Sequence, residues 1–313
     1  MARLALIADS LGESSIAAEV RSNIKSVLTP WLESTNSDPL QYDQTWGGLC
    51  SSAGLRDGGA DFGNGLYNDH HFHYGYHIYA AAVVGKEDSS FINQYKEKLL
   101  TYARDFANPS TEDPYFPVTR NKDWFNGHSW ASGVTEFGDN RNQESTSEAI
   151  NGYYGVHLLG VALGDNDMRD FGRLLLAMEI RSARKYWHIE DTSIYPADFA
   201  PNRMVGVLWD TKVDYATWFG GNVEYIHGIQ MLPFTPVTEL SLDPTFVSEE
   251  YPVVENTGAQ NEWLSYMIMD EAVIDPVTAW NKLNSAPISS WAGNSKTNAL
   301  WWIATRAPRS ETQ

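Results

Sequence analysis

The pattern with the clearest chemical potential is a pair of glutamates, Glu144 and Glu148, with three small polar residues between them. On a helix, residues at this spacing lie on one face. A third carboxylate, Asp69, stands earlier in the chain among histidines and aromatic residues. Carboxylates on separate elements can act as proton donor and proton acceptor, which hydrolysis of a glycosidic bond requires. The three side chains therefore form a candidate acid–base set.

Each of these carboxylates also has a purely structural interpretation. Asp69 stands where the N-cap of a helix is expected. Ser145 and Glu148 match the capping-box pattern, and the helix dipole favours a glutamate in the first turn. Spacing alone does not choose between cap and catalyst. If Glu144 and Glu148 both face one cleft, their repulsion raises the pKa of one of them. One could then serve as the base and the other could position water.

A stripe of histidines follows Asp69, because His73 and His77 continue at intervals of four residues. With His70 and His71 beside them, these imidazoles have a spacing at which zinc could bind. The His-Glu-x-x-His pattern of many zinc enzymes is absent. We therefore interpret the histidines as neutral side chains that line a sugar-binding cleft, and we predict neither a metal nor a cofactor.

Aromatic residues are abundant, with 12 Trp and 16 Tyr in the chain. Flat, half-polar rings suit the faces of sugars. Two loop segments, 124–130 and 218–227, concentrate such rings, although packing within the loops explains them equally well. From these segments and the motifs around the carboxylates we expect substrate contacts from seven side chains: Tyr67, His73, His77, His128, Trp130, Tyr153 and Trp218.

Charge and composition limit the possible partners. The formal net charge is −18, from 40 acidic and 22 basic residues, so phosphate backbones and anionic lipid surfaces are repelled. A neutral polymer is compatible with this field. A single cysteine, Cys50, excludes an intrachain disulfide. We find neither an apolar run of membrane-spanning length nor a signal-peptide pattern in the chain.

Apolar stripes at helical spacing predict a mostly helical protein. We expect two helices within residues 2–33, separated at Gly12, one short strand near 42–49, and further helices at about 69–84, 89–108, 144–163, 165–187, 260–272, 275–283 and 296–305. The stretches 34–68 and 109–141 are expected to be long loops, and loops of that length are usually functional.

A weak internal repeat indicates how the helices are arranged. Residues 75–85 and 154–164 both begin with an aromatic, histidine-bearing turn, continue with an apolar half and stop at glycine. Repeated helical hairpins of this kind stack against one another. Because one set of connections is long and the other short, we predict an all-α fold in which hairpins close into an (α/α) toroid, rather than an open solenoid.

Three motifs together resemble glycoside hydrolase family 81, the endo-β-1,3-glucanases. They are residues 67–76 (YNDHHFHYGY), residues 142–149 (NQESTSEA), and residues 218–221 (WFGG) leading to 228–233 (GIQMLP). The resemblance covers nearly the whole chain. It implies an (α/α)6-type toroid and endo-acting, inverting hydrolysis of β-1,3-glucan, such as laminarin or cell-wall glucan. It also implies that Asp69 is the general acid, that Glu144 or Glu148 is the base, and that His73 lies in the cleft.

The chain departs from this family in extent. Family members carry an N-terminal β-sandwich domain before the toroid, and no such segment is present in these residues. We expect residues 1–313 to form a single toroid domain, the C-terminal part of a longer architecture, incomplete at its N-terminus. The resemblance implies a secreted protein.

Two other functions compete with the glucanase interpretation. One is a β-glucan-binding protein without catalysis on the same fold, for which the aromatic residues would suffice. Three carboxylates, Asp69, Glu144 and Glu148, favour an enzyme over this alternative. The other is a toroid-type uronate lyase, which would need a basic cleft for its anionic polymer and is disfavoured by the charge of −18. The sequence leaves the oligomeric state open.

Overall fold

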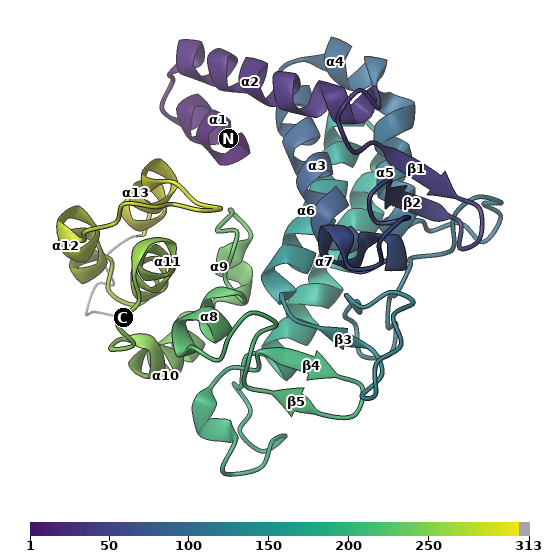
Figure 1. Ribbon diagram of the computed structural model, residues 1–313. Coiled ribbons are helices and arrows are strands. Elements are labelled where there is room, and N and C mark those ends of the chain that lie inside the picture. The colour runs from purple at the N-terminus through teal and green to yellow at the C-terminus, as the bar shows by residue number, and fades with distance from the viewer. Residues whose placement is uncertain (307–313) are drawn as a thin grey trace. The chain divides into compact units, whose positions relative to one another are not determined.

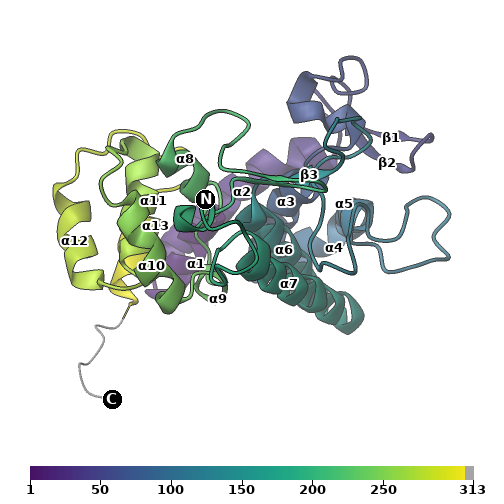
Figure 2. The ribbon, with the colours of Figure 1, turned by 90° about the horizontal axis from the view of Figure 1, so that it is seen from below.

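The computed structural model of the protein describes residues 1–306, most of which lie in helices (Figures 1 and 2). The chain forms two compact units. Unit 1 comprises Met1–Gln143 and Glu148–Glu179, and unit 2 comprises Glu144–Ser147 and the described residues from Ile180 onward. The predicted all-α class is confirmed, whereas the single toroid domain stays a prediction. Residues 307–313, which follow the last predicted helix, lie outside the described residues.

Unit 1 is built from long helices with a small hairpin among its loops. Its elements are α1 Ala2–Ser10, α2 Ser14–Leu32, β1 Leu40–Asp43, β2 Gly48–Ser51, the 3-10 helix η1 Ala60–Leu66, α3 His70–Gly85, α4 Ser89–Gln94, α5 Lys96–Ala107, β3 Asn142–Gln143, and most of α6 Thr146–Leu163 and α7 Asn166–Tyr186. The strands β1 and β2 pair antiparallel. The single strand predicted near residues 42–49 is therefore a two-stranded hairpin.

Helices α3 and α6 pack with their backbones in direct contact, and glycines make this possible. A Cβ atom on Gly75 would lie 2.4 Å from the Cα of Gly152, and a Cβ on Gly152 would lie 2.3 Å from the carbonyl oxygen of His71. Further along, a Cβ on Gly155 would lie 3.1 Å from the backbone nitrogen of Tyr79. The contacts advance along both helices in the same direction, so α3 and α6 are parallel and their N-termini lie at the same end.

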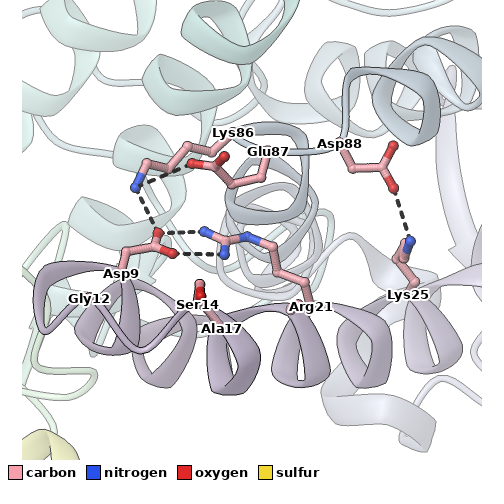
Figure 3. A pocket seen from close by; sticks show the side chains of 10 residues that line it. Asp9, Gly12, Ser14, Ala17, Arg21, Lys25, Lys86, Glu87 and Asp88 are labelled. Carbon is pink, nitrogen blue, oxygen red and sulfur yellow. Dashed lines mark hydrogen bonds and ion pairs between the residues drawn. The ribbon is translucent and has the colours of Figure 1, made fainter.

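Ion pairs connect the C-terminal end of α3 to the first two helices. The charged side chains border a hollow of about 600 Å³ between α1, α2 and the residues after α3 (Figure 3). The Arg21 guanidinium donates two hydrogen bonds to Asp9, of 2.9 and 2.5 Å, and a third of 3.1 Å to the carbonyl of Val83. The Lys86 ammonium lies 2.7 Å from the same carboxylate. The hydrogen bond from Arg21 lowers the pKa of Asp9 to about 2. We interpret the hollow as structural, because these charges are already satisfied by one another.

Unit 2 consists of shorter helices and a second hairpin. Its elements are the 3-10 helix η2 Ala200–Asn202, the antiparallel strands β4 Val207–Trp209 and β5 Val213–Asp214, and the helices α8 Val223–Gly228, α9 Thr238–Ser241, α10 Pro244–Val254, α11 Asn261–Glu271, α12 Pro276–Ser285 and α13 Lys296–Ala304. The last three confirm the predicted helices. The sequence did not predict α10, because its prolines looked like breaks. Pro244 instead occupies the first turn, where a missing N–H costs little.

Two predicted helix boundaries are wrong. The helix expected over 89–108 is two helices, because Tyr95 has a non-helical backbone (φ −104°, ψ 12°) between α4 and α5. The helix expected to begin at Glu144 begins at Thr146. The side-chain oxygen of Gln230 accepts hydrogen bonds from both the backbone N–H and the hydroxyl of Thr146, at 3.0 and 2.9 Å. A side chain distant in sequence thus caps α6, and Glu144 lies in the connection before it.

We expect the substitution Gly75→Ala to lower the free energy of unfolding by about 1–3 kcal/mol, the range for overpacked cores. The added methyl group would meet the backbone of Gly152, which cannot move aside as a flexible side chain can. Equilibrium unfolding in urea measures the change. Gly138→Ala is the matched control, because a Cβ at Gly138 meets no atom within 4 Å. Equal stability of the two variants would contradict the close approach of α3 and α6.

Candidate active site

Asp69 occupies the N-cap position of α3, yet its side chain makes no capping hydrogen bond. Its backbone is left-handed (φ +61°), an unfavourable conformation for a residue with a Cβ. The conformation is held by its N–H, which donates to the carbonyl of Ala131 at 2.8 Å, and by its carbonyl, which accepts from the N–H of His73 at 2.9 Å. The carboxylate is partly exposed. Asp69 is therefore the N-cap residue by position, as expected, but its side chain does not cap the helix, and a left-handed backbone instead orients the acid.

Glu148 lies in the first turn of α6 and is also partly exposed. Its Oε1 accepts a hydrogen bond of 2.8 Å from the hydroxyl of Tyr76. Tyr76 stands seven residues after Asp69, close to two helical turns, so both lie on the same face of α3. The N-terminal ends of the parallel helices α3 and α6 thus bring an acid, a phenol and a second acid to one end of unit 1. Sequence reasoning missed Tyr76, although its spacing from Asp69 was a usable signal.

A buried polar network holds the strand that precedes the glutamates. The Nε2–H of His71 donates to the side-chain oxygen of Gln143 at 2.9 Å, and the amide nitrogen of Gln143 donates to Glu179 at 2.8 Å. Glu179 forms an ion pair of 3.0 Å with Lys122, and both side chains are fully buried. Burial lowers the pKa of His71 to about 4, so its ring is neutral near pH 7. The network anchors Gln143, the residue directly before Glu144.

Glu144 belongs to unit 2, where different groups hold it. Its carboxylate accepts a hydrogen bond of 2.8 Å from the backbone N–H of Trp218, and its carbonyl accepts one of 2.7 Å from the side chain of Gln230. Trp218 is 57% exposed, as a substrate-contacting side chain must be, and its ring packs on Trp209 with centroids 5.6 Å apart. Beside it Phe219 is 53% exposed. Glu144 is itself partly exposed and accompanied by accessible rings.

The remaining side chains predicted to contact substrate fall into two groups. His73 and His77 are partly exposed, and burial lowers the pKa of each, so both rings are neutral near pH 7, as expected. Four others are buried and contact protein groups, so we assign them to the packing beneath the surface: Tyr67, His128, Trp130 and Tyr153. Tyr67, for example, donates to Asp43 at 2.8 Å. The burial of these four side chains could not be predicted from the sequence, because the same type of ring can stack on a sugar or pack inside the protein core.

Two of the four imidazoles that suggested zinc, those of His70 and His71, are hydrogen-bonded to protein groups. His70 lies 2.7 Å from the carboxylate of Asp105 and 2.8 Å from the carbonyl of Asn64, and His71 is bound to Gln143. Within residues 1–306, no three His, Cys, Asp or Glu side chains are grouped so that they could hold a metal ion. None of the helices in this part of the chain is both long and apolar enough to span a bilayer.

A family profile described as the glycosyl hydrolase family 81 C-terminal domain matches residues 1–303. By this match the chain is a glycoside hydrolase domain. It belongs to glycosyl hydrolase family 81, as the three motifs indicated.

Curated relatives and a solved structure agree with this assignment. A Glycine max protein named glucan endo-1,3-beta-D-glucosidase is 39% identical, over 98% of this chain and 48% of its own length. A Schizosaccharomyces pombe protein named primary septum glucan endo-1,3-beta-D-glucosidase is 36% identical, over 96% of this chain and 30% of its own. A family 81 structure from Clostridium thermocellum, solved as a mutant, superposes with a TM-score of 0.85 at 31% identity, over 96% of this chain and 42% of that one. The chain thus spans less than half the length of each.

We expect the stability of the fold to decrease as the pH falls from about 6.5 to about 4. The ring of His71 is neutral when buried, with a pKa of about 4, but takes up a proton near pH 6.5 in the unfolded chain. The unfolded state therefore binds more protons in this range, and stability falls with the pH. The pKa difference corresponds to about 3 kcal/mol. NMR titration of the ring and urea unfolding at pH 7 and pH 4 measure the effect.

The control for this prediction is His71→Gln, which keeps a hydrogen-bond donor but cannot titrate. This variant should lose about 3 kcal/mol of the pH dependence, whatever its stability at pH 7. A His71 ring that titrates near its ordinary value would contradict the buried network.

Proposed function

We propose that this protein is an endo-acting β-1,3-glucan hydrolase with an inverting mechanism. Asp69 serves as the general acid, and either Glu144 or Glu148 serves as the general base. The observation that carries the proposal is the presence of Asp69 and Glu148, both partly exposed, at the shared N-terminal end of two parallel helices. The names of the relatives support the substrate, but the chain covers less than half of them, so activity and substrate remain our inference.

The chemistry follows from two carboxyl groups in different protonation states. An inverting enzyme holds its acid and base about 6.5–9.5 Å apart, which leaves room for one water. Asp69 donates its proton to the glycosidic oxygen as the bond to the anomeric carbon breaks. The base takes a proton from the water that attacks the opposite face of that carbon. The hydrogen bond from Tyr76 favours the ionised form of Glu148, as a base or a water-positioning group requires.

The substrate class agrees with the charge and the exposed rings. A neutral polysaccharide is not repelled by a protein of net charge −18, whereas the anionic polymers of lyases are. The exposed rings of Trp218 and Phe219 offer apolar faces near Glu144. Because β-1,3-glucans are cell-wall polymers, we propose that the protein acts outside the cell. Nucleic acid and membrane surfaces are not expected partners.

We expect the first products released from laminarin to be α-anomers, because a single displacement inverts the β-linkage. Proton NMR during the first minutes of digestion measures this before mutarotation. Initial β-anomers would exclude inversion. Binding of laminarin with no release of reducing ends would instead identify a glucan-binding protein.

Substitutions of the carboxylates accompany this experiment. Asp69→Asn should abolish laminarin hydrolysis while retaining part of the activity toward a glycoside with a dinitrophenyl leaving group, which needs no protonation. Substitution of the base should abolish both activities. A Glu148→Gln variant with wild-type hydrolysis would exclude Glu148 as the base and leave Glu144 in that role.

The substitution Tyr76→Phe should reduce kcat/KM about ten- to a hundredfold, because a hydrogen bond to a charged group is worth about 1.5–3 kcal/mol. If Glu148 is the base, the acidic limb of the pH–rate profile should also move to higher pH, because a donor that favours the ionised carboxylate is lost. Steady-state kinetics from pH 4 to pH 8 measure both effects. An unchanged profile with unchanged kcat/KM would show that Tyr76 does not position Glu148 for catalysis.

A further inference from the structure

Residues 61–63, in the loop that leads to Asp69, have an unusual backbone. Asp61, Phe62 and Gly63 are consecutive left-handed residues, with φ of +51°, +59° and +83°. Glycine adopts this region freely, but for a bulky residue such as phenylalanine it is a genuine outlier. Such strain persists where neighbouring contacts impose it, and it gathers at ligand-binding positions.

The contacts that impose the strain come from the residue next to Asp69. The side-chain nitrogen of Asn68 donates to the carbonyl of Phe62 at 3.5 Å, and its side-chain oxygen accepts from the N–H of Gly133 at 2.9 Å. A Cβ on Gly63 would lie 2.4 Å from the Asn68 side-chain nitrogen, so the loop is pressed against it. The placement of Phe62 is therefore tied to the same short segment that orients Asp69.

Burial of the Phe62 ring does not offset the free-energy cost of this strain, because Phe62 is 78% exposed. Its ring packs edge-on against His73, with centroids 5.8 Å apart. His73 lies one turn after Asp69 on the same stripe of α3, so the Phe62 ring stands beside the face that carries Asp69 and Tyr76. A folded protein gains little from a strained, hydrated ring, and a ligand that covers the ring would gain from it.

We propose that Phe62 is a stacking platform for the glucosyl unit adjoining the bond that Asp69 protonates. The inference rests on the proposed function. A β-linked glucose carries its hydroxyls around its equator, so its two faces present C–H groups, and a flat aromatic ring matches such a face. Because the backbone already holds the ring in place, binding requires little further ordering. Phe62 thus selects for a neutral, β-linked sugar beside the acid.

Three substitutions at Phe62 test whether the flat ring matters. In the full chain, Phe62→Ala and Phe62→Leu should each raise KM for laminarin tenfold or more, about 1.4 kcal/mol of binding free energy per tenfold change. Leucine keeps much of the apolar area but lacks a flat face. Phe62→Tyr keeps the ring and should keep KM within about twofold of the wild type. The matched control is Val161→Ala, because Val161 is 54% exposed but lies near the C-terminal end of α6, away from Asp69 and Glu148, and should leave KM unchanged.

A fourth variant separates binding from folding. Phe62→Gly relieves the left-handed strain, so its Tm should equal or exceed that of the wild type while its KM rises as for alanine. A lower Tm with unchanged KM would show that Phe62 serves the fold and would overturn the proposal. Unchanged KM in Phe62→Ala, or an equal rise in Val161→Ala, would also overturn it. If the wild type releases no reducing ends from laminarin, the proposed function itself fails. That result is distinct from a failure of the Phe62 proposal, in which the wild type hydrolyses laminarin and the Phe62 variants keep its KM.

Discussion

The direct backbone contact between α3 and α6 is the constraint on which the candidate site depends. Gly75 and Gly152 permit an approach that any side chain would prevent, and the approach brings the beginnings of two parallel helices to one end of unit 1. Asp69 and Glu148 stand at those beginnings. Close-packed backbones cannot relax independently, so the relative position of the two acids is set by packing rather than by the acids themselves.

Unit 1 also buries an ion pair at a position where apolar side chains would avoid the cost of removing charges from water. Lys122 and Glu179 are fully buried, and together with Gln143 and His71 they form a connected network. The free energy needed to remove two charges from water is about as large as the free energy gained from their attraction, so the pair adds little net stability. Its directional bonds do determine where Gln143 lies. The network thus holds Gln143, the residue before Glu144, in one position.

The two glutamates illustrate how a sequence pattern can mislead about geometry. Their spacing matched one helical face, but the helix begins between them. Gln230 caps α6 at Thr146. The carboxylate of Glu144 accepts from the backbone N–H of Trp218, whereas that of Glu148 accepts from the hydroxyl of Tyr76. Each acid therefore has its own donor, and each donor comes from a different motif. The capping contact joins residues far apart in the chain, so no local pattern could reveal it.

The sequence by itself determined the family, the helical class and the acidic residues, because motif identity and hydrophobic periodicity are local properties of the chain. It also placed most helices, including α11 to α13, within a few residues. The tertiary structure alone decided which rings are accessible, and it moved Tyr67 and Trp130 into the core while leaving Phe62 exposed. Burial, backbone strain at Asp69 and the donors to each glutamate all depend on residues brought together by folding, and that information is spread over the whole chain.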